Sequence, residues 1–221
     1  MSSYLMIPGA GGAGWFWHRV VPLLEAAGHE AIAIDLPGPD PEAGLPEYTE
    51  LVLAAAEGRT DVVLAAQSMG GFTAPLVAAR RPLKALVLVN AMIPVPGETA
   101  GQWWDDTGAQ PARIQAAQEG GYSTEFDVDT YFLHDVPPEV LEGGPAPRDE
   151  SEAAFASPCD FTAWPDIPIH VVAGRDDRFF PAEFQRRLAK DRLGVEADVL
   201  PGGHLIGLAH PEPLAQYLLD L

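Results

Sequence analysis

Short apolar runs rich in β-branched residues alternate along this chain with longer segments whose apolar residues recur at helical spacing. The predicted strands are residues 4–7, 30–35, 61–66, 84–90, 167–174 and 195–201. The predicted helices are residues 15–27, 47–57, 71–81, 182–191 and 212–220. Alternating strands and helices joined by short turns predict an α/β fold with a six-stranded, mostly parallel sheet and helices on both faces. We expect a single domain spanning residues 1–221.

The alternation is interrupted at residues 91–163, between two strands that should be neighbours in the sheet. This segment is rich in proline, glycine and acidic residues, and it also contains several aromatic residues. A connection this long inside a compact domain is usually functional or disordered, and the aromatic content argues against disorder. We therefore predict that residues 91–163 form a small, partly helical cap over the C-terminal edge of the sheet.

Charge and cysteine content narrow the range of partners. The formal net charge is −19, from 32 acidic and 13 basic residues, and such a field repels nucleic acid and anionic membranes. The one cysteine, Cys159, allows no intramolecular disulfide and lacks basic neighbours that would activate a thiolate. The N-terminus has no signal-peptide pattern, and no apolar stretch approaches the roughly 20 residues of a membrane span. We expect a cytoplasmic protein; its oligomeric state is left open.

The most informative motif is AAQSMGG, residues 65–71, which lies between a predicted strand and a predicted helix. It is a near match to the G-x-S-x-G nucleophile elbow, with Ala66 at the first glycine position and Gly70 at the second. A sharp strand-to-helix turn exposes the Ser68 hydroxyl and directs the first helix amides at the same space, where they favour an anion. Ser68 is therefore the candidate nucleophile.

Two further motifs follow predicted strands later in the chain. AGRDDRFFP, residues 173–181, offers Asp176 and Asp177 as candidate acids, and PGGHLIG, residues 201–207, offers His204. Ligands of open parallel sheets bind beyond the C-terminal ends of the strands, so these groups should meet Ser68 there. The order serine, acid, histidine along the chain is that of α/β-hydrolases.

These residue types fit nucleophilic catalysis. A serine hydroxyl attacks well only when a base takes its proton, and an imidazole, with an ordinary pKa of about 6.5, can take and return it near neutral pH. A buried carboxylate fixes the histidine tautomer. The oxyanion needs backbone donors, for which we predict the Met69 amide and the Ala10 amide in the glycine-rich turn after the first strand.

The predicted cap suggests the substrate pocket. If it faces the site, Trp104, Tyr131, Phe132 and His134 are the candidates to line the pocket, and its aromatic residues indicate an apolar substrate. The remaining histidines are interpreted as structural or exposed: His18, His29, His170 and His210.

One rival interpretation begins in the first turn. Residues 9–14 read GAGGAG, a literal G-x-G-x-x-G that follows a strand and opens a helix, and Asp35 ends the next strand. This is the dinucleotide-binding pattern of an NAD-dependent oxidoreductase. That interpretation leaves the motifs around Ser68, Asp177 and His204 without a role, whereas glycines beside an oxyanion site are needed in either case.

Over essentially its whole length the chain resembles the α/β-hydrolase superfamily. Residues 8–38, PGAGGAGWFWHRVVPLLEAAGHEAIAIDLPG, resemble the opening of the plant methylesterase and hydroxynitrile-lyase branch, and YFLHDVPPEV, residues 131–140, resembles the cap of its bacterial esterase relatives. The resemblance implies Ser68 as nucleophile and His204 as base, and its Gly174-x-x-Asp177-x-x-x-Pro181 spacing implies Asp177 rather than Asp176 as acid. It also implies Ala10 and Met69 as oxyanion amides, and neither metal nor organic cofactor.

The chain departs from the family pattern in four respects. Pro8 stands where the family usually has a histidine that supports the oxyanion loop, and Ala66 replaces a glycine. Leu205 stands where hydroxynitrile lyases carry a lysine, which argues against cyanohydrin cleavage. Because the given sequence begins at its first predicted parallel strand, we expect a minimal six-stranded sheet without the antiparallel strands that open larger members.

The function predicted from these residues is hydrolysis of a small, apolar carboxylic ester by a serine hydrolase, through an acyl-enzyme. Three alternatives stay open: cleavage of a lactone, amide or carbon–carbon bond by the same residues, non-catalytic use of the fold as a ligand-binding receptor, and the oxidoreductase.

Overall fold

The computed structural model describes residues 1–221 and is built on one six-stranded sheet in the order β2-β1-β3-β4-β5-β6. Its strands are β1 (Ser3–Ile7), β2 (Glu30–Ala33), β3 (Val62–Gln67), β4 (Ala85–Val89), β5 (Ile169–Gly174) and β6 (Ala197–Leu200). All five pairings are parallel, so the predicted strand number is confirmed and the sheet is entirely rather than mostly parallel. The C-terminal ends of all six strands therefore meet at one edge.

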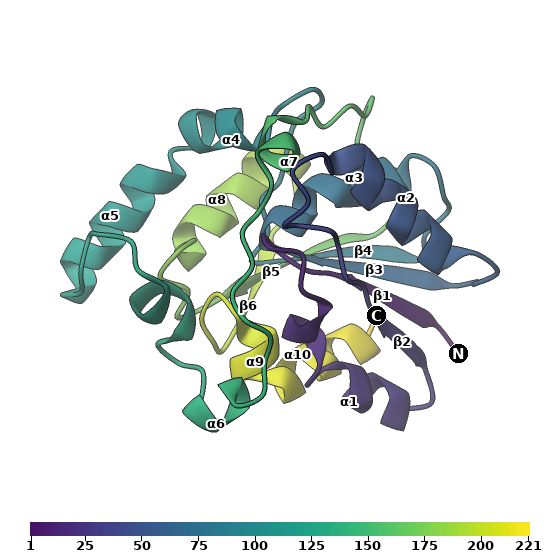
Figure 1. The fold of residues 1–221 in the computed structure, drawn as a ribbon, viewed down its shortest axis with the longest axis horizontal. Helices are drawn as coiled ribbons and strands as arrows, with labels where there is room; N and C mark the ends of the chain where they lie inside the picture. Colours follow the sequence, from purple (N-terminus) through teal and green to yellow (C-terminus); the bar gives the residue numbers. More distant parts are fainter.

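Helices cover both faces of this sheet (Figure 1). One face carries α2 (Leu45–Ala56), α3 (Thr73–Ala78) and α8 (Ala182–Leu193); the other carries α1 (Val21–Ala26) and α10 (Pro211–Leu219). Alternate side chains of each strand enter the two cores, as the period of a strand requires: Leu5 and Ile7 pack on the first face, Tyr4 and Met6 on the second. This double cover confirms the predicted fold class.

The segment 91–163 connects β4 to β5, which pair directly with each other. It contains α4 (Ala100–Thr107), α5 (Ala109–Gly120), a π-helical turn η3 (Asp129–Leu133), α6 (Pro138–Leu141) and α7 (Glu152–Ala156). Trp103 is fully buried and packs on the Phe180 and Phe184 rings at centroid distances of 5.2 and 5.8 Å, while the Ser151 hydroxyl donates to the Ala43 carbonyl at 2.6 Å. The segment is thus packed onto the sheet domain at both ends, and its action as a cap stays a prediction.

Three local predictions differ from the structure. The helix expected at 15–27 is a 3-10 turn, η1 (Gly14–Trp17), followed by α1, because Pro22 lacks an amide hydrogen and fits only the first turn of a helix. The helix expected at 71–81 begins as a 3-10 turn, η2 (Ser68–Phe72), and α3 is correspondingly short. A further short helix, α9 (Ile206–Ala209), was not predicted.

Close packing around the elbow makes one glycine essential to the fold. A Cβ atom on Gly71 would lie 1.9 Å from the Met92 carbonyl oxygen, a backbone atom that has little room to move. We expect Gly71→Ala to lower the free energy of unfolding by about 3 kcal/mol. As a matched control, Gly101→Ala in α4, where the nearest atom is 3.9 Å away, should raise it by about 0.5–1 kcal/mol. Urea unfolding curves of the two variants give both values, and equal stability would contradict the packing argument.

Candidate active site

The turn after β3 holds Ser68 in a strained backbone conformation. Its φ is +51°, a left-handed value that costs a non-glycine residue energy and that nucleophile elbows use to expose the serine hydroxyl. The chain can turn this sharply because Gly70 lies against the Pro8 carbonyl, where a Cβ would come within 2.5 Å of the oxygen. The elbow predicted from AAQSMGG is therefore formed, with Ala66 accommodated as an ordinary buried residue of β3.

Three residues far apart in sequence form one hydrogen-bonded chain beyond the strand ends. The His204 Nε2 atom lies 3.1 Å from the Ser68 hydroxyl, and its Nδ1 atom lies 2.9 Å from the Asp177 carboxylate. Because an ionised carboxylate can only accept, Nδ1 carries the proton, and Nε2 is left free to accept from the serine. All three residues are buried, so their hydrogen bonds are shielded from competing water.

The carboxylate of Asp177 is held by more than the histidine. Its Oδ1 atom accepts from the Phe179 and Phe180 amides at 2.8 and 2.9 Å, and its Oδ2 atom also accepts from the Gln185 side chain at 3.3 Å. These donors fix the direction in which the acid faces His204. Gln185, on α8, has no motif that would have indicated this role in the sequence.

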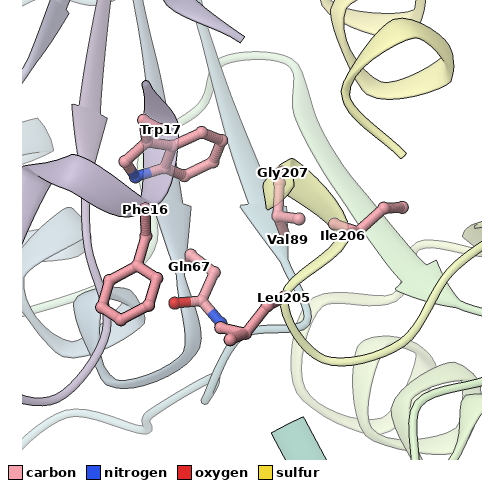
Figure 2. Close-up of a pocket in the computed structure, with 7 residues that line it drawn as sticks. All are labelled: Phe16, Trp17, Gln67, Val89, Leu205, Ile206 and Gly207. Atoms are coloured by element: carbon pink, nitrogen blue, oxygen red, sulfur yellow. The ribbon is translucent and has the colours of Figure 1, made fainter. Parts of the chain in front are cut away.

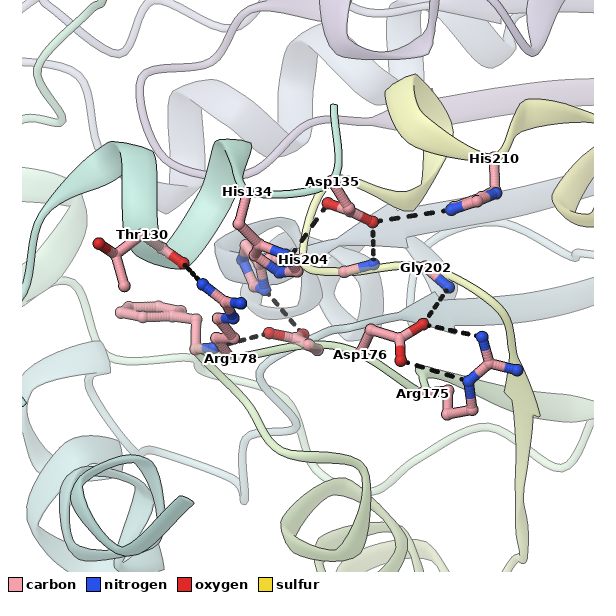
Figure 3. Close-up of polar contacts among 12 residues, drawn as sticks. Thr130, His134, Asp135, Arg175, Asp176, Arg178, Gly202, His204 and His210 are labelled. Carbon is pink, nitrogen blue, oxygen red and sulfur yellow. Dashed lines mark hydrogen bonds and ion pairs between the residues drawn. The ribbon is translucent and has the colours of Figure 1, made fainter. Parts of the chain in front are cut away.

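Asp176, the other candidate acid, points elsewhere. It forms an exposed ion pair with Arg175 at 3.0 Å and accepts from the Gly202 amide at 3.3 Å (Figure 3). The hydrogen bond from Arg175 lowers the pKa of the Asp176 carboxyl below its ordinary value. The structure thus brings Asp177, and not Asp176, to His204.

A buried amide joins the loops that carry the acid and the histidine. Asn90, which follows β4 with φ at +46°, donates to the Gly203 and His204 carbonyls at 2.9 and 3.0 Å. Its own carbonyl accepts from the Gly174 amide at 2.6 Å. Gln67, beside the serine, also donates to the His204 carbonyl. The sequence analysis assigns Asn90 no role; its one signal in the sequence is a polar residue at the end of an apolar run.

The two predicted oxyanion residues flank the serine. Met69 follows Ser68 directly. The turn at residues 9–12 packs against it so closely that a Cβ on Gly9 would lie 2.9 Å from the Ser68 Cβ atom. Ala10 is exposed, and its amide donates no hydrogen bond within the protein, whereas the next two amides of the turn are both engaged. The Ala10 amide is therefore the donor of this turn that has no partner within the protein.

Aromatic rings enclose the imidazole of His204. The Phe132 ring comes from η3 of the segment 91–163, which we call the insertion, and stacks on the imidazole at a centroid distance of 4.8 Å and an angle of 19°. The Phe179 and Phe180 rings meet the imidazole edge-on at 5.1 and 5.2 Å. Trp104 packs on both of these phenylalanines, one layer further out. Of the predicted pocket residues, Phe132 is thus in direct contact with the histidine, and Trp104 is behind it.

The other two predicted pocket residues have different surroundings. Tyr131 is fully buried within the insertion, where its hydroxyl donates to the Ser123 carbonyl at 2.5 Å. Its ring packs on Tyr122 and Phe126 rather than on the His204 ring. His134 lies beside Asp135, 3.9 Å from its carboxylate, and burial lowers the pKa of the His134 imidazole (Figure 3). Asp135 in turn accepts from the Gly203 amide at 2.6 Å. His134 therefore borders the histidine loop rather than the serine.

Most amides of the glycine-rich turn, which a dinucleotide would need, donate to groups of the protein itself. The Gly14 amide donates to the Asp35 carboxylate at 3.0 Å, the Gly11 amide to Glu150 at 2.7 Å and the Gly12 amide to the Gly9 carbonyl at 3.1 Å. A dinucleotide needs these amides for its pyrophosphate and the acid for its ribose. Three amides of the turn are therefore already engaged within the protein, which argues against the oxidoreductase interpretation.

A small, partly open pocket lies between η1 and the start of α9, next to Gln67 at the end of β3 (Figure 2). It has a volume of ≈ 10 Å³ and is lined by Phe16, Trp17, Gln67, Val89, Leu205, Ile206 and Gly207. This space holds about one water molecule, which is less than an ester needs. No three histidine, cysteine, aspartate or glutamate side chains are grouped so as to bind a metal ion, and no helix has the length and apolar character needed to cross a membrane.

The parallel sheet, the strained elbow and the histidine loop at the strand ends together define an α/β hydrolase. Residues 4–217 match the model of the alpha/beta hydrolase family, and the chain belongs to that family. It is 30% identical to a pyrethroid hydrolase of Sphingobium wenxiniae, in an alignment covering 100% of this chain and 87% of the relative. It is 35% identical to methylesterase 7 of Arabidopsis thaliana, covering 99% and 95%.

A solved structure supports the fold independently. The pyrethroid hydrolase of Sphingobium faniae superimposes with a TM-score of 0.79, covering 99% of this chain and 96% of that one at 24% identity. The family match and the named relatives make this chain a carboxylesterase-like α/β hydrolase.

Proposed function

We propose that this protein hydrolyses small, apolar carboxylic esters with Ser68 as nucleophile, His204 as base and Asp177 as the acid that orients it. The observation that carries the proposal is the hydrogen-bonded chain from the Ser68 hydroxyl through His204 to Asp177. A nucleophile in contact with a base that is itself oriented by a third group is the arrangement that acyl transfer requires.

The first half of the reaction forms an acyl-enzyme. His204 Nε2 takes the proton from Ser68 as Oγ attacks the ester carbonyl, and the imidazolium that results is stabilised by Asp177. The carbonyl oxygen becomes an oxyanion, which accepts from the Ala10 and Met69 amides. When the carbon–oxygen bond breaks, His204 returns the proton to the leaving alcohol, and the acyl group remains on Ser68.

The second half reverses these roles with water. His204 takes a proton from a water molecule, which attacks the acyl carbonyl through the same oxyanion geometry. Collapse of the intermediate expels the Ser68 alkoxide, which recovers its proton from His204. The products are the carboxylic acid and the regenerated serine, so no cofactor is consumed.

The surroundings of His204 favour an apolar substrate. Phe132, Phe179 and Phe180 contact its ring, so a substrate at Ser68 meets aromatic carbon, and the buried acid offers no free charge to pair with a charged ester. We extend the proposal to the segment 91–163, which supplies Phe132 and acts as a cap over the strand ends. The relatives named as a pyrethroid hydrolase and as a methylesterase support an ester as substrate.

Turnover of a matched set of esters tests this proposal. p-Nitrophenyl acetate and butyrate should be hydrolysed at measurable rates, and a p-nitrophenyl ester of succinic acid, similar in length to butyrate but charged, should have a kcat/KM lower by about 10-fold or more, because its carboxylate has to leave water for an aromatic site. Faster turnover of the charged ester, or of a peptide, would contradict the proposed substrate class.

A further inference from the structure

Ala10 lies in the turn that follows β1. This turn begins with Pro8, which has no polar side chain that could hold the turn in place. The brace comes instead from the end of the insertion. The Glu150 carboxylate accepts from the Gly11 amide at 2.7 Å, across 139 positions of sequence. Gly11 directly follows Ala10, so this bond fixes the peptide next to the free amide.

Glu150 is itself held on both sides. The Tyr48 hydroxyl, from α2, donates to its other carboxylate oxygen in a short hydrogen bond, and burial raises the pKa of the Tyr48 phenol. The following residue, Ser151, caps α7 by accepting from the Ala154 amide at 3.0 Å and donates to the Ala43 carbonyl. The carboxylate therefore has a fixed position relative to the sheet domain.

The turn is shaped to receive this contact. Gly11 has φ at +82°, and a Cβ there would lie 2.6 Å from the Arg148 carbonyl oxygen, so only glycine allows the insertion to approach. Burial raises the pKa of the Glu150 carboxyl, which means that placing its charge here costs free energy. A half-buried acid placed at this cost beside the turn of Ala10 points to a role beyond packing.

We propose that Glu150, held by Tyr48, is a positioning residue that sets the Ala10 amide for the oxyanion. This inference rests on the function proposed above. It makes the end of the insertion part of the catalytic geometry: Glu150 touches neither substrate nor Ser68, and acts only through the Gly11 peptide.

The test compares Glu150→Ala and Glu150→Gln with Glu152→Ala, an exposed acid two positions away. Glu150→Ala should lower the kcat for p-nitrophenyl butyrate by about 10²-fold with KM unchanged, because the misplaced amide weakens only transition-state binding. Affinity for an alkyl trifluoromethyl ketone, whose hemiketal oxyanion mimics that state, should fall by the same factor. Glu150→Gln keeps an acceptor for Gly11 and should recover most of the rate, and Glu152→Ala should match the parent.

The Tyr48→Phe variant distinguishes a positioning role of Glu150 from a contribution to the stability of the fold alone. It should lower kcat in the parent but have no further effect in the Glu150→Ala background, since its action passes through the carboxylate. Parent-like kcat and inhibitor affinity in folded Glu150→Ala would overturn the inference while leaving the proposed function intact, as would a rise in KM alone. A parent chain without turnover or labelling of Ser68 would refute the proposed function, and the inference with it.

Discussion

Ser68→Ala is expected to lose about 10⁶-fold in kcat on p-nitrophenyl butyrate and to form no adduct with a fluorophosphonate probe. The loss should be this large because in the proposed mechanism the Ser68 hydroxyl forms the acyl-enzyme, and alanine at this strained turn offers no nucleophile in its place. Intact mass and peptide mapping of the labelled parent should place a single adduct on the peptide containing Ser68.

Folding of the Ser68→Ala variant is the control for this experiment. Alanine keeps the backbone conformation and removes one oxygen, so the urea midpoint should stay close to that of the parent. An adduct on a different serine, or a variant that keeps its turnover, would show that the elbow is not the site of attack.

Asp177→Asn should reduce kcat by about 10⁴-fold, whereas Asp176→Asn should change it by less than about 3-fold. An amide at position 177 favours donating to the His204 Nδ1 atom, which moves the imidazole proton to Nε2 and leaves Ser68 without a base. Asp176 pairs with Arg175 at the surface, and an asparagine there can still accept from Gly202. Steady-state kinetics of the two variants, made side by side, measure the difference.

This pair of adjacent residues is its own matched control. Both substitutions remove one charge from the same loop, so any general effect of charge or folding should appear in both. Equal losses would mean that the loop, and not the contact with His204, is responsible. A larger loss in Asp176→Asn would show that Asp177 is not the acid.

The sheet could be predicted from the sequence because each strand is defined locally. β3 and β4 are continuous apolar runs of the kind that only a doubly covered parallel sheet buries, and their boundaries lie within a residue of the prediction. Ser68, Asp177 and His204 were predictable for a related reason. Each follows such a strand, and parallel strands bring their C-terminal ends to one edge.

The contacts that refine the site could not be predicted in the same way. Glu150 reaches Gly11 from a proline-rich stretch with no periodicity, and no local pattern states where such a stretch returns to the domain. Tyr131 and Phe132 are neighbours in sequence, yet one is buried inside the insertion and the other stacks on His204, because η3 turns them in different directions. Which of two adjacent rings meets the histidine depends on that turn alone.

The entry and exit of the insertion, between the directly paired strands β4 and β5, have an evolutionary consequence. Residues can be added to or deleted from the middle of 91–163 without shifting the register of any strand, so its length and sequence are less constrained than those of the sheet. The limits on that drift are the contacts that hold the segment to the domain, among them those of Trp103, Phe132, Glu150 and Ser151. Lineages of this fold can therefore acquire new substrates by exchanging one surface segment, at little risk to the inherited scaffold.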